Sequence, residues 1–158
     1  MASQIVELYN ALALTSITVN GVAVRVKRLD ETPSKLDTAD LPVRVLTPIS
    51  QVRPQNANSA VWAVGASSVV TQITWTIADI MYWQPVAQNV GIQAVADELV
   101  AYMRDYLSML KTFSPPASGS TMWIANVGLQ AGVYEYPILS GRLFYGVVAT
   151  LTITEKMA

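Results

Sequence analysis

The ten residues VVTQITWTIA, from Val69 to Ala78, carry the strongest secondary-structure signal in the chain. They are β-branched, aromatic, small or polar, and their side chains fall into two alternating rows. One row contains Val69, Thr71, Ile73, Trp75 and Ile77. A period of two with these residue types is typical of a β-strand with one buried face. We therefore predict a central strand over residues 69–78, which the sequence allows to continue to Trp83.

Two segments follow the helical period instead. Residues 4–14 come directly after Ser3, a residue type that caps helices, and their apolar side chains form one stripe. The second helix is predicted over residues 92–110, with a longer stripe. The two stripes contain Ile5, Leu8, Tyr9 and Leu12 in the first helix, and Ile92, Val95, Ala96, Leu99, Met103, Tyr106 and Leu110 in the second.

Shorter alternating runs predict the remaining strands. The dipeptide Asn20-Gly21 is a tight-turn signal, and it precedes a strand over 22–27. A strand over 41–47 is bounded by Pro42 and Pro48, which predicts a position at the sheet edge. Further strands are expected over 61–66 and 121–127, with a closing hairpin formed by 134–138 and 142–154. The polar segments 29–40, 49–60 and 113–120 are expected to be loops.

The order of helix, strands, helix and strands predicts one α+β domain over residues 1–158. We expect a mostly antiparallel β-sheet with two α-helices packed on one face. In the last strand Val147, Ala149, Leu151 and Ile153 should face the core. The alternate row, Val148, Thr150, Thr152 and Thr154, should face solvent or a partner.

The composition excludes several classes of function. The 158 residues include no Cys and no His, so thiolate chemistry, Ser-His-Asp catalysis and ordinary zinc sites lack their key residues. The formal net charge is −1, whereas a protein that binds nucleic acid by neutralising phosphates needs an excess of cations. We expect no enzyme activity, no cofactor and no metal.

The chain also lacks the signals for export and membrane insertion. The first cation is Arg25, so a secretory signal is not expected, and no run of about 18 apolar residues is present. We expect synthesis in the cytosol and no membrane partner.

Two motifs resemble catalytic ones but have the wrong context. The tetrapeptide Ser108-Met-Leu-Lys111 matches the acylating motif of penicillin-binding enzymes, but it falls at a helix end and the companion motifs are absent. Asp97 and Asp105 are two helical turns apart, about 12 Å, which is too far for a carboxylate pair. A frayed helix end and a solvated helix face explain these residues.

The large aromatic rings are numerous for a chain in which only 13% of the residues are charged. Aromatic residues and arginine are favoured at the centres of protein interfaces, where other charges are depleted. Candidate interface residues are Arg53, Trp62, Trp83, Trp123 and Tyr134. The alternative is that these rings cap the ends of the core.

The order of these features resembles the tail terminator (tail completion) proteins of long-tailed bacteriophages. The resemblance rests on Leu41-Pro-Val-Arg-Val45, on the strand 71–79 followed by the helix over 91–110, and on the segments 131–134 and 145–152 of the closing hairpin. It implies a virion protein, assembled in the host cytoplasm, that forms a homohexameric ring. Such a ring caps the tail tube, ends tail polymerisation and presents a surface to the head-side connector protein, and DNA passes its pore without specific binding.

Two alternatives stay open. A head-tail connector (neck) protein is also a small ring former. A soluble α+β enzyme or ligand-binding domain would have to use Asp79, Arg104 and Glu135 for acid–base chemistry. For the ring, we hypothesise that residues 49–68 and 112–127 carry the contacts between subunits or between rings.

Overall fold

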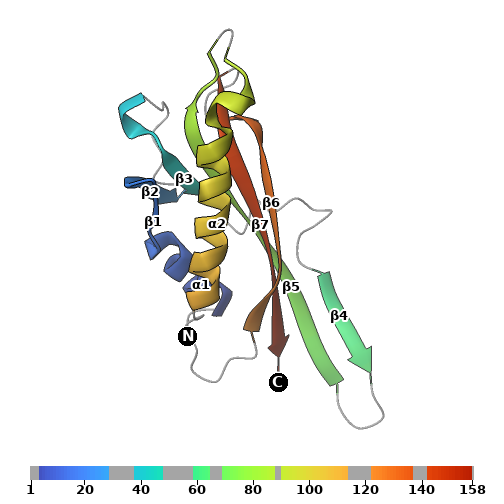
Figure 1. Cartoon of the computed structure of the whole chain (residues 1–158). Coiled ribbons are helices and arrows are strands. Elements are labelled where there is room, and N and C mark those ends of the chain that lie inside the picture. Colours follow the sequence, from blue (N-terminus) through green and yellow to red (C-terminus); the bar gives the residue numbers. More distant parts are fainter. Residues whose placement is uncertain are drawn as a thin grey trace.

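The computed structural model describes residues 4–28, 38–47, 59–64, 69–87, 90–113, 122–136 and 142–157. The predicted loops lie largely outside these ranges, as does Ser3. The described elements are α1 (Gln4–Leu14), β1 (Ile17–Val19), β2 (Val22–Arg28), η2 (Thr38–Asp40), β3 (Val43–Leu46), β4 (Ser59–Val64), β5 (Val69–Pro85), η4 (Ile92–Val95), α2 (Ala96–Thr112), β6 (Met122–Glu135) and β7 (Leu143–Met157). Figure 1 shows them as one long sheet with α2 running along it.

The strands form a seven-stranded, mostly antiparallel sheet in a mixed α and β fold. The strand order is β1-β2-β3-β5-β7-β6, and β4 also pairs with β5. Among the described strand pairs, only β2–β3 is parallel. The prediction that the segment 41–47 lies at the sheet edge is wrong, because β3 lies between β2 and β5. Both prolines flank β3, so neither removes a hydrogen-bond donor from its ladder.

The long pair β5 and β7 forms the centre of the sheet. Ile77 lies opposite Leu151 in the register, and all four predicted core residues of β7 are fully buried. The two strands approach closely at Gly146, where an added Cβ would overlap the backbone carbonyl oxygen of Met81. A glycine is therefore required at this position.

Both helices contribute to one hydrophobic cluster with β5 and β7. The predicted stripe of α1 is buried in it, as are Leu99 and Tyr106 of α2. The sequence did not indicate Tyr102, which is also fully buried. The second helix begins with the 3-10 turn η4, and only residues 96–112 are α-helical.

A smaller cluster lies on the opposite side of the sheet. Its buried members are Val43, Val45, Tyr82, Tyr136 and Phe144. Tyr82 contacts both other rings edge to face, at centroid distances of 5.5 and 5.6 Å. Burial raises the pKa of the Tyr82 hydroxyl, and nearby Tyr136 adds to the effect. This cluster packs at the end of the sheet where strand β5 ends and strand β7 begins.

Strand lengths differ from the prediction mainly in β6. The sequence predicts separate strands over 121–127 and 134–138, whereas β6 runs without a break from Met122 to Glu135. Gly128, Gln130 and Gly132 weaken the local strand signal. Pairing with β7 along the whole segment overrides that local preference.

Candidate interaction surface

A buried ion pair lies where β3, β5 and the two helices meet. The side chains of Arg44 on β3 and Asp79 on β5 are both fully buried, and the distance from Arg44 Nε to Asp79 Oδ2 is 2.7 Å. Leu46 lies opposite Asp79 in the register, so the two charged residues are diagonal neighbours on one face of the sheet. Sequence reasoning did not pair them, because the two residues are 35 positions apart in the chain.

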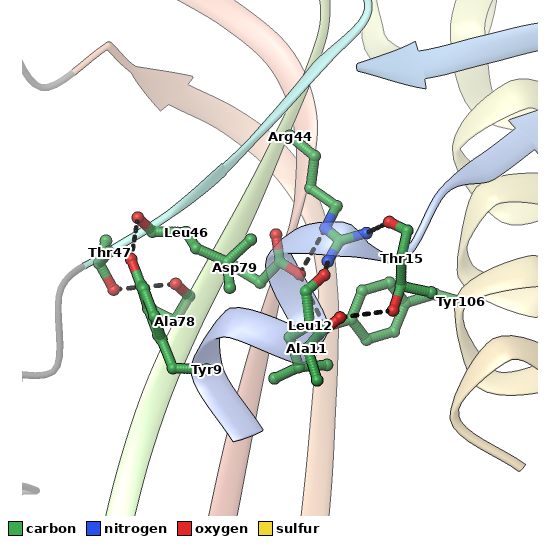
Figure 2. A network of polar contacts seen from close by, with 10 residues as sticks. All are labelled: Tyr9, Ala11, Leu12, Thr15, Arg44, Leu46, Thr47, Ala78, Asp79 and Tyr106. Atoms are coloured by element: carbon green, nitrogen blue, oxygen red, sulfur yellow. Dashed lines mark hydrogen bonds and ion pairs between the residues drawn. The ribbon is translucent and has the colours of Figure 1, made fainter. Parts of the chain in front are cut away.

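The guanidinium of Arg44 also caps the C-terminal end of α1. Its Nη2 donates to the carbonyl oxygen of Leu12 at 2.7 Å, and its Nη1 donates to that of Thr15 at 2.9 Å. Figure 2 shows the guanidinium between these carbonyls and the Asp79 carboxylate. The last carbonyls of a helix lack partners within it, and a cation there is favoured by the helix dipole. Arg44 thus joins α1 to the sheet.

The carboxylate of Asp79 is also bound from the side of α2. The Tyr106 hydroxyl donates to Asp79 Oδ2 at 2.9 Å. Burial raises the pKa of the Asp79 carboxyl above its ordinary value, and Arg44 and Tyr106 oppose this effect only in part. Burial lowers the pKa of Arg44, but the neighbouring acidic groups, Asp79 first, more than offset it. The guanidinium is therefore charged at any physiological pH.

Full burial separates Asp79 from any substrate in solution. The other two residues considered for acid–base chemistry, Arg104 on α2 and Glu135 at the end of β6, are exposed. The three residues thus come from three separate elements, β5, α2 and β6. Among the residues that the structure describes, no group of three or more acidic side chains could hold a metal ion.

Where β5, β7 and β6 run side by side, the face of the sheet that points away from the large core cluster carries mainly threonine, glycine and glutamine. Side chains alternate along strands, so every second residue of these strands lies on this face. We call it the threonine face; its described members are Thr74, Thr76 and Ala78 of β5, Val148, Thr150 and Thr152 of β7, and Trp123, Asn126, Gly128 and Gln130 of β6. Those of β6, together with Thr150, are exposed. The same side of the sheet carries Arg25 and Lys27 farther away, on β2, opposite Val43 and Val45.

The threonine face follows the predicted pattern of the last strand with one departure. Thr150 is exposed and Thr152 is half-buried, whereas Thr154 is only 6% exposed. Trp123 and Thr74 lie directly opposite Thr154 in the two neighbouring strands.

The structure places the candidate interface residues in different surroundings. Trp123 is 43% exposed on the threonine face. Tyr134 lies on the same side of β6, is half-buried, and its hydroxyl donates to the Gln130 carbonyl at 2.8 Å. Burial raises the pKa of this hydroxyl. Trp83 is half-buried and packs against the large core cluster.

The other two candidates are less fully described. Trp62 belongs to β4, where its backbone pairs with Thr71, and its side chain is outside the description. Arg53 lies outside the described residues. Of the two segments expected to carry subunit contacts, 49–68 contains β4, and 112–127 contains the end of α2 and the first residues of β6.

The sequence placed Asn126 in a predicted strand and in a predicted contact segment, but it placed Gln130 in neither. Only the register with β7 shows that the two residues share a strand face. Residues 122–134 contain no charged side chain, and charges are depleted at interface centres. This composition could have indicated a contact surface.

Comparisons with known proteins do not assign this chain to a family. Neither the protein-family models nor the curated protein sequences contain a match to it. Among the described residues, no helix combines the length and apolar character needed to cross a lipid bilayer.

Proposed function

We propose that this chain is a structural protein of a phage tail, a tail terminator that forms a homohexameric ring in the virion. The observation that supports this most is the threonine face. It lies along the longest strands of the sheet, the ten residues that define it are uncharged, and it exposes Trp123. Surfaces of this kind suit protein contacts, since charges are depleted and aromatic residues enriched at interface centres.

The proposal includes a finer arrangement of the fold. Both helices pack on a single face of the sheet, which leaves the threonine face for neighbouring molecules. Copies of the chain would bind one another head to tail, because only heterologous contacts close into a ring of six. The ring would contact the tail tube protein on one side and the head-side connector protein on the other.

The charge balance supports a passive pore. With a net charge of −1, the chain has no excess of cations to hold phosphates. DNA would therefore pass through the ring without specific binding. Burial of Asp79 inside the fold likewise weighs against the alternative of a small enzyme built on that residue.

Tail assembly in the absence of this protein tests the role. A terminator predicts overlong tails, because nothing then ends tube polymerisation. Tails of normal length that fail to bind heads would assign the protein to the connector instead. Normal, head-joined tails would refute both.

A charge on the threonine face tests the surface itself. The Thr150→Lys variant places an ammonium group at an exposed position of the face. Burying that unpaired charge in an interface should weaken self-association about tenfold or more. The matched control is Ser108→Lys, which adds the same group at an exposed position of α2. Equal self-association of Thr150→Lys and the wild type, measured by analytical ultracentrifugation, would exclude this face.

A further inference from the structure

The outer edge of β6 is a long unpaired strand edge. β6 is the last strand in the sheet order and has 14 residues. Within the described ranges it pairs with β7 alone, so the backbone groups that point away from β7 have no strand partner. Such an edge is a template for another β-strand, and monomeric proteins protect it.

None of the usual protective features is prominent in β6. Edge strands are normally short or carry lysine or proline. β6 contains neither residue, and its only charged residue is Glu135 at the very end. It has one irregularity, between Ile124 and Asn126, and the N–H of Val127 donates to Asn126 Oδ1 at 2.9 Å, which leaves the stretch from Gly128 to Tyr134. At Gly128, no atom of the described residues outside its own stretch of chain lies within 4 Å of the position that a Cβ would occupy, so the face of the strand is also open there.

The same chain offers a complementary edge in β4. This strand has the uncharged sequence SAVWAV and pairs with β5 on one side only, within the described residues. In Figure 1 it lies at the far side of β5 from β7. Strands β4 and β6 thus form opposite borders of the sheet, and neither border carries charge that would repel the other. Through Thr74 and Thr154, Ser59 of β4 is level with Trp123 at the start of β6.

The directions of the two strands fit each other between copies. β4 is antiparallel to β5, β5 to β7, and β7 to β6, so β6 runs opposite to β4. Copies related by rotation about an axis inclined to the strands keep these directions and are displaced along them, so that β4 of one copy can lie level with residues 128–134 of β6 in the next. We propose that the edge of β6 pairs antiparallel with β4 of the next copy, which makes a continuous sheet across the subunit boundary. The inference rests on the proposed ring and names the contact that builds it.

Hydrogen exchange and proline variants test the backbone pairing. In an antiparallel pair, neighbouring residues alternate between an N–H that points to the partner strand and one that points away. Between the exposed neighbours Gln130 and Ala131, one N–H therefore points outward from β7. We expect that amide to be protected in assembled protein and to exchange rapidly in dilute monomer.

Proline removes a backbone N–H, and we compare the variants Gln130→Pro and Ala131→Pro. The variant that removes the N–H pointing away from β7 should keep the thermal stability of the monomer. It should weaken assembly about tenfold, as expected for lost interstrand hydrogen bonds. The other variant, which removes a bond to β7, serves as the control for a damaged monomer. Equal exchange of the outward amide in both states would overturn the pairing.

Cysteine cross-linking identifies the partner strand. The wild-type chain has no cysteine, so every disulfide would come from engineered positions. Gln130→Cys is combined in turn with a cysteine at each position of β4, Ser59–Val64. A covalent ladder of subunits on oxidation is expected for one or two of these pairs. Cross-linked dimers of the Gln130→Cys single variant would show β6 pairing with β6 and overturn the assignment to β4.

These results separate the two proposals. A wild-type protein that stays monomeric at all concentrations contradicts the ring itself. Rings that form with an unprotected β6 edge and no ladder leave the ring proposal intact and exclude the β6–β4 contact.

Discussion

Removing the charge of Arg44 should strongly lower the free energy of unfolding of the protein. In the Arg44→Met variant a side chain of similar length fills the site, but the Asp79 carboxylate loses its ion pair at 2.7 Å. Breaking a fully buried pair costs about 3–5 kcal/mol, because the remaining charge stays uncompensated. The carbonyl of Leu12 also loses a buried donor, which adds about 1 kcal/mol or more. The total, about 4–6 kcal/mol, reaches the lower end of the stability of a small domain, about 5–15 kcal/mol.

The double variant Arg44→Met/Asp79→Leu separates charge from packing. It removes both charges, so only the Tyr106 hydroxyl and the carbonyls at the end of α1 lose partners. We expect its free energy of unfolding to exceed that of Arg44→Met by about 2 kcal/mol or more. Replacing a buried pair by apolar groups is far less costly than breaking it.

Urea unfolding followed by tryptophan fluorescence gives the free energies of unfolding. The wild type, the two single variants and the double variant form a complete thermodynamic cycle. Additive losses in the double variant, or a loss below about 1 kcal/mol for Arg44→Met, would refute the idea that this pair holds α1 and the sheet together.

Two further substitutions are predicted from the core. Gly146→Ala should destabilise the protein by about 1–3 kcal/mol or more, because its Cβ would overlap the Met81 carbonyl, whereas Gly128→Ala, with open space around it, should change the urea midpoint little. Equal effects of the two glycine variants would contradict the close approach of β5 and β7. Tyr102→Phe removes a buried hydroxyl that has no hydrogen-bond partner among the described residues, so it should leave stability at pH 7 equal or higher. Burial, with Asp79 adding to it, raises the pKa of Tyr102 well above 10, so the unfolded chain releases this proton first. The wild type should then lose stability as the pH rises above about 10, while Tyr102→Phe should lose less. Parallel stability curves of the two proteins across that range would exclude the buried hydroxyl.

Local sequence patterns predicted the parts of the fold whose periodicity is strong. The helix over residues 4–14 and its buried stripe are confirmed, as are the strand from Val69 and the inward row of β7. The turn at Asn20-Gly21 is confirmed by positive φ angles of 50° and 82°. In each case a local preference and the tertiary contacts favour the same structure.

The remaining features depend on contacts between distant residues. The place of β3 inside the sheet follows from its pairing with β5, which flanking prolines do not reveal. The continuity of β6 through its glycines follows from its register with β7. The pairing of Arg44 with Asp79 depends on three elements meeting, and the strand pattern around each residue gave no sign of it.

The candidate interface was predicted only by residue type. Aromatic composition indicated Trp123 and Trp83 alike, but alternation along the sheet places Trp123 on the threonine face and Trp83 against the core. A sequence does not state which side of a strand stays uncovered when the strand order is unknown. Face assignment therefore had to come from the structure.

The native mass of the purified protein tests the central claim most directly. Each chain has a mass of 17.1 kDa, so a closed ring of six predicts one species at six times that mass. Native mass spectrometry should show this species at micromolar concentrations, and negative-stain images should show six-fold rings. A single 17.1 kDa species at every concentration, alone and with tail tubes, would contradict a ring-forming role.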